Sequence, residues 1–375
     1  MNVGITCYPT YGGSGVVATE LGLELAARGH QVHFITYANP IRLDPGTPRI
    51  HYHEVEVSSY PLFQYPPYCL ALASRMAEVA ETYELDVLHV HYAVPHSIAA
   101  LLAQQMLARQ RRLPFITTLH GTDITLVGND RSYFPITKFS IEKSDGITSV
   151  SGYLRRETIK VFGVESEIRV IKNFVNCERY NPDNEKTEAA LYAPAGEKLL
   201  IHVSNFRPVK RVLDCVRILA QVRRSVPAHL LMVGDGPDRG PAEHLARELN
   251  VERHVSFLGK QDHIERLIRL AHVLLMPSAL ESFGLVALEA MACGVVPVAT
   301  RVGGVPELIT DGEDGFLETP GDIQAQAARV VTLLSDGDLH YRMAKTGRWN
   351  AAERYCPDKI IPLYEKYYRD VIERG

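Results

Sequence analysis

Residues 2–36 decide the fold; they read NVGITCYPTYGGSGVVATELGLELAARGHQVHFIT. The apolar run Asn2–Tyr8 predicts a strand, the glycine-rich residues 9–15 predict a turn, and Val16–Arg28 carries apolar residues at helical spacing. A glycine ends the predicted helix, and Gln31–Thr36 predicts a second strand. Strands that alternate with helices run parallel, so this segment predicts the start of a parallel α/β sheet.

The same alternation of short apolar runs and helical stretches continues along the chain and begins again at residue 198. The further strands are expected at Val87–Val90, Phe115–Thr118, Gly146–Val150, Lys198–Ser204, His229–Val233, Val255–Leu258, Val273–Pro277 and Val295–Ala299. Two such series predict two Rossmann-like domains, each a parallel sheet with helices on both faces.

The length of 375 residues also fits two domains, at about 100–200 residues each. We expect the hinge within residues 168–180, which gives a first domain over 1–170 and a second over 171–356. The polar, proline-containing stretch 176–198 beyond the hinge is expected to be a surface loop.

The last segment of the chain predicts a helix that needs a partner surface. Leu363, Tyr367 and Val371 recur at i, i+4 and i+8, and Pro362 is tolerated there if it opens the first turn. We expect this helix, residues 357–375, to join the first domain.

Composition excludes several classes of protein. The chain is 46% hydrophobic and 22% charged, which is typical of a soluble globular protein. Its net charge of −4 provides no general basic field for nucleic acid or an anionic membrane, so an anionic ligand must be met by local cations and backbone amides. No apolar run approaches the about 18–20 residues that a membrane span needs.

The six cysteines are scattered and include no C-x-x-C pair, which argues against a zinc ribbon or a disulfide framework. We therefore expect free thiols and a cytoplasmic protein. His89, His91 and His96 are the other candidate metal ligands, but no acidic residue accompanies them at metal-site spacing, and we expect no metal.

The glycine-rich loop Gly12–Gly15 lies between a predicted strand and a predicted helix. Small residues there let backbone amides and the helix N-terminus face an anion such as a phosphate or a carboxylate. The spacing is not G-x-G-x-x-G, so the dinucleotide fingerprint is not satisfied. A tight turn that serves only helix packing is the equally supported alternative.

A second pattern, E-S-F-G-L-V-A-L-E-A-M-A-C-G, occupies residues 281–294 and places Glu281 and Glu289 on either side of a turn into a helix. Each carboxylate can accept two hydroxyl groups, and the amides of Phe283–Val286 can point at a phosphate between them. By spacing alone, two exposed helix charges are the better explanation of the pair, since two glutamates at this distance occur often by chance.

The order of motifs changes that balance, because residues 281–294 resemble the E-x7-E element of the retaining glycosyltransferases of family 4, which have the GT-B fold. The segments G-G-V-P-E at 303–307 and D-G-x-x-G at 311–315 are similar to motifs of the same family, as are G-D-G-P at 234–237, F-L-G at 257–259 and H-G-T-D at 120–123. The resemblance implies two Rossmann-like domains that face a central cleft.

A narrower match is to the branch of that family that glycosylates L-malate in the first step of bacillithiol biosynthesis. Its residues are G-I-T-C-Y-P at 4–9, G-G-S-G-V-V at 12–17, F-Q-Y-P-P-Y at 63–68, L-H-V-H-Y-A at 88–93 and S-N-F-R-x-V-K-R at 204–211. The match implies UDP-N-acetylglucosamine as donor and L-malate as acceptor, both of them substrates, with no cofactor. The alternatives are a lipid or polysaccharide acceptor, a nonhydrolysing UDP-sugar epimerase, and a catalytically silent sugar-nucleotide-binding protein.

The resemblance also assigns roles to residues. Lys210, with Arg207 or Arg211, would stabilise the departing UDP without a metal, Glu289 would hold the ribose, Glu281 the transferred sugar, and His120 the outer sugar hydroxyls or the reacting carbon. The catalytic residues implied are His120, Lys210 and Glu281. The donor-binding residues implied are Gly13, Gly15, Arg207, Lys210, Arg211, Asp235, Glu281, Phe283, Gly284, Leu285, Val286 and Glu289.

The acceptor-binding residues that fit the family pattern are Ser14, Gly15, Tyr92, Thr118 and Asn205. A basic residue is also expected before Val255, and His254 occupies that position although it lacks the bidentate grip of an arginine. Because no carboxylate of the first half stands out as a nucleophile, we expect a same-face displacement through an oxocarbenium-like state. In it the departing β-phosphate oxygen would accept the malate hydroxyl proton.

Two features stay open. Residues 60–68 mix prolines with aromatic residues and predict a stiff apolar loop, which would be a lip near the acceptor, a contact in a homo-oligomer, or an ordinary packed loop. Arg109, Arg111 and Arg112 predict a solvated helix end.

Overall fold

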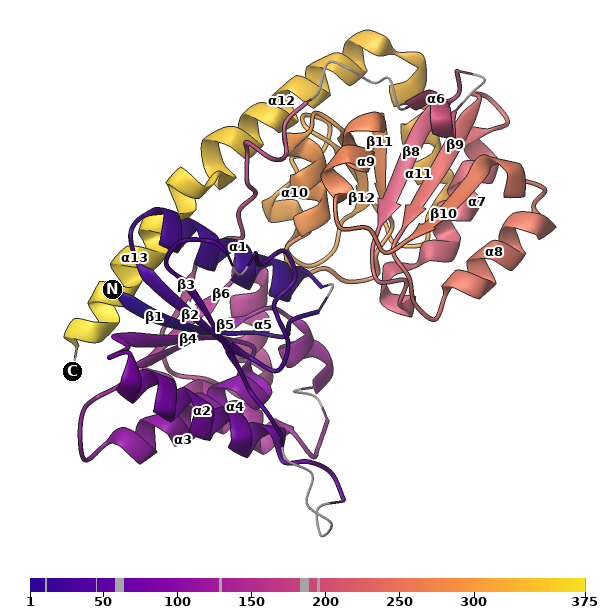
Figure 1. Ribbon diagram of the computed structural model, residues 1–375. Helices are drawn as coiled ribbons and strands as arrows, with labels where there is room; N and C mark the ends of the chain where they lie inside the picture. Colours follow the sequence, from indigo (N-terminus) through magenta and orange to yellow (C-terminus); the bar gives the residue numbers. More distant parts are fainter. Residues whose placement is uncertain are drawn as a thin grey trace. The chain divides into compact units, whose positions relative to one another are not determined.

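The computed structural model describes residues 1–10, 12–44, 46–57, 64–127, 130–182, 189–193 and 196–374 (Figure 1). The chain divides into two compact units. Unit 1 comprises Met1–Asn173 and Asp358–Gly375, and unit 2 comprises Phe174–Pro357. The chain passes from unit 1 to unit 2 after Asn173, three residues beyond the expected boundary at 170/171. It returns to unit 1 after Pro357, one residue beyond the expected boundary at 356/357.

Unit 1 is built on a parallel sheet in the order β3-β2-β1-β4-β5-β6-β7. The strands are β1 (Asn2–Thr6), β2 (Gln31–Thr36), β3 (Ile50–Glu54), β4 (Val87–His91), β5 (Phe115–Leu119), β6 (Gly146–Ser149) and β7 (Ile168–Val170). The α-helices are α1 (Gly13–Ala27), α2 (Tyr68–Thr82), α3 (Ile98–Leu107), α4 (Phe134–Glu142), α5 (Gly152–Phe162) and α13 (Pro357–Glu373). Short π-helices follow β4 at Ala93–Ser97 and β5 at Asp123–Val127.

Unit 2 has a second parallel sheet, in the order β10-β9-β8-β11-β12-β13. The strands are β8 (Lys198–Val203), β9 (Ala228–Val233), β10 (Val255–Gly259), β11 (Val273–Met276), β12 (Val296–Thr300) and β13 (Phe316–Glu318). The α-helices are α6 (Ala189–Tyr192), α7 (Val212–Val222), α8 (Arg239–Glu248), α9 (Ile264–Leu270), α10 (Leu285–Ala292), α11 (Ile323–Ser335) and α12 (Gly337–Tyr355). Three 3₁₀ turns lie at Pro208–Lys210, Glu252–His254 and Val305–Glu307.

Helix α13 completes unit 1 from the far end of the chain. The Tyr368 hydroxyl lies 2.7 Å from His89 Nδ1 on β4, and the Ile147 amide of β6 donates to the Tyr367 hydroxyl at 2.9 Å. Of the expected repeat, Tyr367 and Val371 are buried and only Leu363 is exposed, at 44%. Tyr364 and Tyr368 complete the buried face. Pro362 lies inside the helix and not in its first turn, so the helix forgoes one backbone hydrogen bond there.

The expectation of free thiols is wrong for two of the six cysteines. Cys177 and Cys356 form a disulfide with their Cα atoms 5.7 Å apart, whereas Cys7, Cys69, Cys215 and Cys293 are free. Spacing along the chain did not indicate this pair, because 179 positions separate the two residues. The disulfide joins the segment that enters unit 2 to the segment that leaves it.

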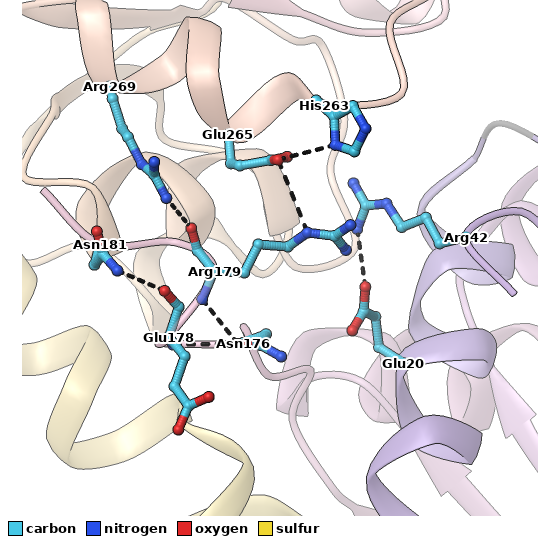
Figure 2. A network of polar contacts seen from close by, with 9 residues as sticks. All are labelled: Glu20, Arg42, Asn176, Glu178, Arg179, Asn181, His263, Glu265 and Arg269. Atoms are coloured by element: carbon cyan, nitrogen blue, oxygen red, sulfur yellow. Dashed lines mark hydrogen bonds and ion pairs between the residues drawn. The ribbon is translucent and has the colours of Figure 1, made fainter. Parts of the chain in front are cut away.

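The entering segment is also held by polar contacts within unit 2 (Figure 2). The Asn176 Oδ1 accepts hydrogen bonds from the amides of Glu178 and Arg179, at 3.1 and 2.9 Å. Arg269 of α9 donates to the Arg179 carbonyl, and the Arg179 guanidinium faces Glu265 of the same helix at 3.9 Å. The turn at 176–179 is therefore fixed against α9.

Candidate active site

The order of strands determines which loops can form a site. β1 pairs with both β2 and β4, and β8 pairs with both β9 and β11, so the chain reverses its direction of winding next to β1 and next to β8. In open α/β sheets ligands bind beyond the carboxyl ends of the strands at such switch points. The predicted residues of the glycine-rich loop follow β1, and those of the Lys210 segment follow β8.

In unit 1, the glycine-rich loop makes a close turn from β1 into α1. A Cβ on Gly15 would lie 2.5 Å from the Tyr8 carbonyl oxygen, so only glycine fits at this position. Helix α1 begins at Gly13, and its N-cap Gly12 supplies no side-chain cap. Because the first amides of a helix lack partners within it, those of residues 13–15 are suited to an anion.

Four histidines, His89, His91, His96 and His120, form what we call the imidazole row, at the ends of β4 and β5. The Nδ1 of His91 lies 2.8 Å from His120 Nε2, and the rings of His89 and His91 have centroids 4.4 Å apart. Burial lowers the pKa of His89 and of His120 to about 3 and that of His96 to about 4. The row is therefore neutral near pH 7, and His120 acts there as a neutral hydrogen-bonding group.

Tyr92 packs against His120. The two rings stack with centroids 5.7 Å apart, and the Tyr92 hydroxyl lies 2.8 Å from Thr122 Oγ1. The Asp123 carboxylate accepts the Gly121 amide at 2.7 Å, and burial raises the pKa of Asp123 to about 6. The aspartate of the H-G-T-D motif thus stabilises the turn of its own loop by accepting a backbone hydrogen bond.

Thr118, which is expected to take part in acceptor binding, lies in the interior of unit 1. Its side chain is fully buried, and its hydroxyl lies 2.6 Å from both His89 Nε2 and Thr148 Oγ1. Because β5 is an inner strand, a side chain in its middle points into the core of unit 1 and not beyond the strand end. The role of Thr118 in acceptor binding stays a prediction, and its hydroxyl is here engaged with two side chains of unit 1.

In unit 2, Lys210 and Glu281 meet although 71 positions separate them. The Lys210 ammonium donates to Glu281 Oε1 at 2.6 Å, and the Ser278 hydroxyl donates to the same oxygen at 2.8 Å. Only 23% of the lysine side chain and 13% of the glutamate side chain are exposed. A cation and a carboxylate thus lie together beyond the ends of β8 and β11.

The G-G-V-P-E motif supports this pair through the backbone. The Gly304 amide donates to the Glu281 carbonyl at 2.9 Å, and Gly303 adopts φ of 56°. A Cβ on Gly303 would lie 1.8 Å from the Glu281 carbonyl oxygen, which excludes any side chain. The Ala279 amide also donates to the Val209 carbonyl at 2.8 Å, which joins the loop after β11 to that after β8.

Helix α10 starts beside this loop. Gly284 is its N-cap with φ of 94° and provides no side-chain cap, so the amides of Leu285 and Val286 begin the helix. The Phe283 ring packs edge-on against Tyr355, which leaves its backbone as the part suited to a ligand. Glu289 is 4% exposed, in the second turn of the helix.

Asn205 follows β8, and its Oδ1 is buried without a hydrogen-bond partner among the described residues. The two glycines of G-D-G-P press against the same segment, because a Cβ on Gly234 would lie 1.7 Å from the Ser204 carbonyl oxygen, and one on Gly236 would lie 2.3 Å from the Asn205 carbonyl oxygen. The Asp235 carboxylate between them is exposed and accepts the Gly236 amide at 2.8 Å.

The two arginines flanking Lys210 differ. Arg207 is exposed, whereas Arg211 donates to Asp214 of the following helix at 2.6 Å. The sequence motif thus contains one engaged guanidinium and one exposed guanidinium.

His254 lies away from the other predicted residues. It precedes β10, so it stands where the strands of unit 2 begin, whereas Asn205 and Lys210 stand beyond the end of β8. Opposite ends of parallel strands lie at opposite edges of a sheet. The structure therefore does not support His254 as an acceptor-binding residue.

Sequence reasoning also missed two groups beside the Lys210–Glu281 pair. Ser278 shares Glu281 with Lys210, and His202 on β8 places its Nε2 2.8 Å from Ser204 Oγ. Burial lowers the pKa of His202 to about 4. The position of Ser278 three residues before Glu281 was the available signal.

Two remaining expectations are only partly covered by the structure. Tyr60, Pro61 and Phe63 of the stiff apolar loop lie outside the described residues, while Tyr65 is 78% exposed.

Arg111 donates to the Ala80 carbonyl at 3.2 Å, so it is bound to the end of α2 and not simply solvated. Within the described ranges, no helix combines the length and apolar character that a bilayer crossing requires.

Comparison with known proteins gives matches over both halves of the chain. The model of Glycosyltransferase Family 4 matches residues 11–179, and that of Glycosyl transferases group 1 matches residues 183–349. The chain is 48% identical over 373 residues to N-acetyl-alpha-D-glucosaminyl L-malate synthase of Bacillus anthracis, covering 99% of this chain and 97% of that protein. It is 26% identical to an uncharacterized glycosyltransferase of Methanocaldococcus jannaschii, MJ1607, covering 96% and 95%.

Solved structures share the fold. Sucrose-phosphate synthase from Thermosynechococcus elongatus superposes with a TM-score of 0.80 at 23% identity, covering all of both chains. Anabaena Alr3699/HepE in complex with UDP and glucose gives a TM-score of 0.81 at 20% identity, covering 98% of this chain and 99% of that one. The expected GT-B class of fold is confirmed, and the chain belongs to glycosyltransferase family 4.

Proposed function

We propose that this protein is a retaining glycosyltransferase that moves N-acetylglucosamine from UDP-N-acetylglucosamine to the hydroxyl of L-malate. The products are N-acetyl-α-D-glucosaminyl L-malate and UDP, the first step of bacillithiol biosynthesis. The observation that carries the proposal is the 48% identity over 99% of the chain to an enzyme named for that product. We expect it to act in the cytoplasm.

The UDP moiety is assigned to unit 2. Lys210 provides a cation at the switch point beside β8, and Arg207 offers an exposed guanidinium on the same loop. The amides of Leu285 and Val286 at the start of α10 supply further positive potential. A relative of the same fold was solved with UDP and glucose, which supports a UDP-sugar as donor.

The sugar and the ribose are assigned to the two glutamates. Glu281, held by Lys210 and Ser278, is placed to accept hydrogen bonds from hydroxyls of the transferred sugar. Glu289 is assigned to the ribose hydroxyls. A neutral His120, which stacks on Tyr92, is assigned to the outer hydroxyls of the sugar.

The acceptor is assigned to Asn205, Tyr92 and the amides at the start of α1. The buried Asn205 Oδ1 has no hydrogen-bond partner among the described residues, and an unpaired buried carbonyl is costly until a donor reaches it. A hydrogen-bond donor on a bound substrate would satisfy it. Ser14 and Gly15 present helix N-terminal amides suited to a carboxylate of malate.

For the reaction we infer a same-face displacement. The bond between the anomeric carbon and the β-phosphate oxygen breaks, the malate hydroxyl oxygen bonds to that carbon on the same face, and the hydroxyl proton passes to the departing phosphate oxygen. Lys210 stabilises the charge that develops on UDP, and the remaining residues orient the two substrates. No step requires a metal.

The experiment is to incubate the purified protein with UDP-N-acetylglucosamine and a panel of hydroxy acids, with and without EDTA. Release of UDP that depends on L-malate, together with an α-glycoside of the expected mass, supports the proposal. Turnover with a lipid or polysaccharide acceptor only, epimerisation of the donor, or binding without turnover would refute the malate assignment. D-malate serves as the matched control for the acceptor geometry.

A further inference from the structure

A cluster of two imidazoles and one carboxylate lies at the edge of unit 2 where the strands begin. Glu197 immediately precedes β8, His229 is the second residue of β9, and His254 immediately precedes β10. These three strands are neighbours in the sheet (Figure 1). The parallel order therefore brings together three residues that are up to 57 positions apart, at the edge opposite Lys210 and Glu281.

The two distances from the Glu197 carboxylate to the imidazoles are close to those between the ligand atoms of a bound metal ion. The Nδ1 of His254 lies 3.2 Å from Glu197 Oε1, and the Nδ1 of His229 lies 3.6 Å from Glu197 Oε2. The three ligand atoms all lie within 4.8 Å of one another. Tetrahedral zinc with bonds of about 2.0–2.2 Å separates its ligand atoms by about 3.3–3.6 Å.

The surroundings orient these groups toward one another. The Nε2 of His229 lies 2.8 Å from Ser256 Oγ, which leaves Nδ1 as the nitrogen facing Glu197. Metal-binding histidines generally hold their second nitrogen in this way. The Arg223 guanidinium donates to Glu197 Oε1 at 2.7 Å, and each carboxylate oxygen has a second lone pair for a further partner.

Exposure leaves a route to the cluster. The His229 and Glu197 side chains are 9% and 11% exposed, whereas that of His254 is 30% exposed. An ion can thus enter beside His254 and keep a water as its fourth ligand.

We propose that Glu197, His229 and His254 form a binding site for a divalent transition-metal ion, with zinc as the ion that best suits two imidazoles and one carboxylate. The site is separate from the candidate active site, so it adds no step to sugar transfer. A bound ion would join the beginnings of three strands, including β10 at the edge of the sheet, and would stabilise unit 2 by binding only the folded state.

The experiment uses the full-length, tag-free protein, first treated with EDTA and then dialysed. Titration with Zn²⁺ is followed by calorimetry, by the rise in melting temperature, and with Co²⁺ by its visible absorption. We expect one equivalent to bind. His254→Ala should weaken binding at least tenfold and abolish the rise in melting temperature, and His229→Gln should do the same.

The matched control is His244→Ala. His244 also pairs with a carboxylate, that of Glu248 at 3.1 Å, but it stands on the exposed face of α8, and the described residues offer no third ligand there. It should leave zinc binding unchanged. Absence of saturable binding, or equal binding by wild-type protein and His254→Ala, would overturn the proposal and show that protons alone bridge the cluster.

Discussion

Reduction of the Cys177–Cys356 disulfide should lower the stability of unit 2 by about 5 kcal/mol, because the bond closes a loop of 179 positions. In the chain-entropy treatment the cost of closing a loop rises with the logarithm of its length, and this loop spans nearly all of unit 2. For a unit of this size each kcal/mol changes the melting temperature by about 2–4 °C. The expected decrease is therefore about 10–20 °C.

The assay is thermal unfolding followed by near-ultraviolet circular dichroism and calorimetry, with and without a thiol reductant. Cys177→Ser should reproduce the effect of the reductant and should be insensitive to it. Cys69→Ser is the matched control, since Cys69 is a half-buried free thiol of unit 1.

Thiol titration in denaturant provides an independent count, four before reduction and six after it. Six reactive thiols in the untreated protein, or an unchanged melting temperature in Cys177→Ser, would refute the reasoning.

Three further predictions concern the site and the imidazole row. Lys210→Ala should lower the transfer rate by about 10²–10³-fold, the usual cost of removing one group that stabilises transition-state charge, whereas substitution of the exposed Lys345 by alanine should leave the rate unchanged. A loss of less than threefold in steady-state kinetics would contradict the role of Lys210. Gly303→Ala should displace the backbone of Glu281 and abolish transfer, while circular dichroism shows retained secondary structure. Gly337→Ala, which has open space at its Cβ, should be neutral. Full activity of Gly303→Ala would disprove the dependence of the Glu281 position on Gly303. Burial holds the pKa values of the imidazole row below that of an exposed histidine, near 6.5, so on acidification the unfolded chain binds protons that the folded unit does not. The free energy of unfolding, measured by urea denaturation, should therefore fall as the pH is lowered from about 6.5 to 4, by up to about 1.4 kcal/mol per pH unit for each histidine. A free energy that stays constant or rises over that range would exclude this coupling.

The inner strands of both sheets could be predicted because most of them carry several apolar residues within a run of four to six. Three outer strands were missed: β3 reads I-H-Y-H-E and alternates with polar residues, while β7 and β13 have three residues each. Short or half-polar segments become strands only because a neighbouring strand offers them hydrogen bonds. This dependence on tertiary context is not visible in the local sequence.

In the candidate site, too, the sequence predicted individual residues but not the contacts that depend on tertiary structure. The motifs indicated Lys210 and Glu281 separately, but their contact depends on the loops after β8 and β11 lying side by side, which strand order decides. Closeness to a motif also does not tell whether a side chain enters the core, as that of Thr118 does, or which edge of the sheet it occupies, as with His254.

The placement of α13 has a consequence for how the protein is made. Unit 1 begins at the first residue, yet the tyrosines that complete its core arrive with the last eighteen residues of the chain. During synthesis the whole of unit 2 leaves the ribosome before unit 1 can close, although domains generally fold in order from the N-terminus. The second unit is thus the first that can finish folding, and a chain that stops at residue 357 contains a complete unit 2 attached to an unfinished unit 1.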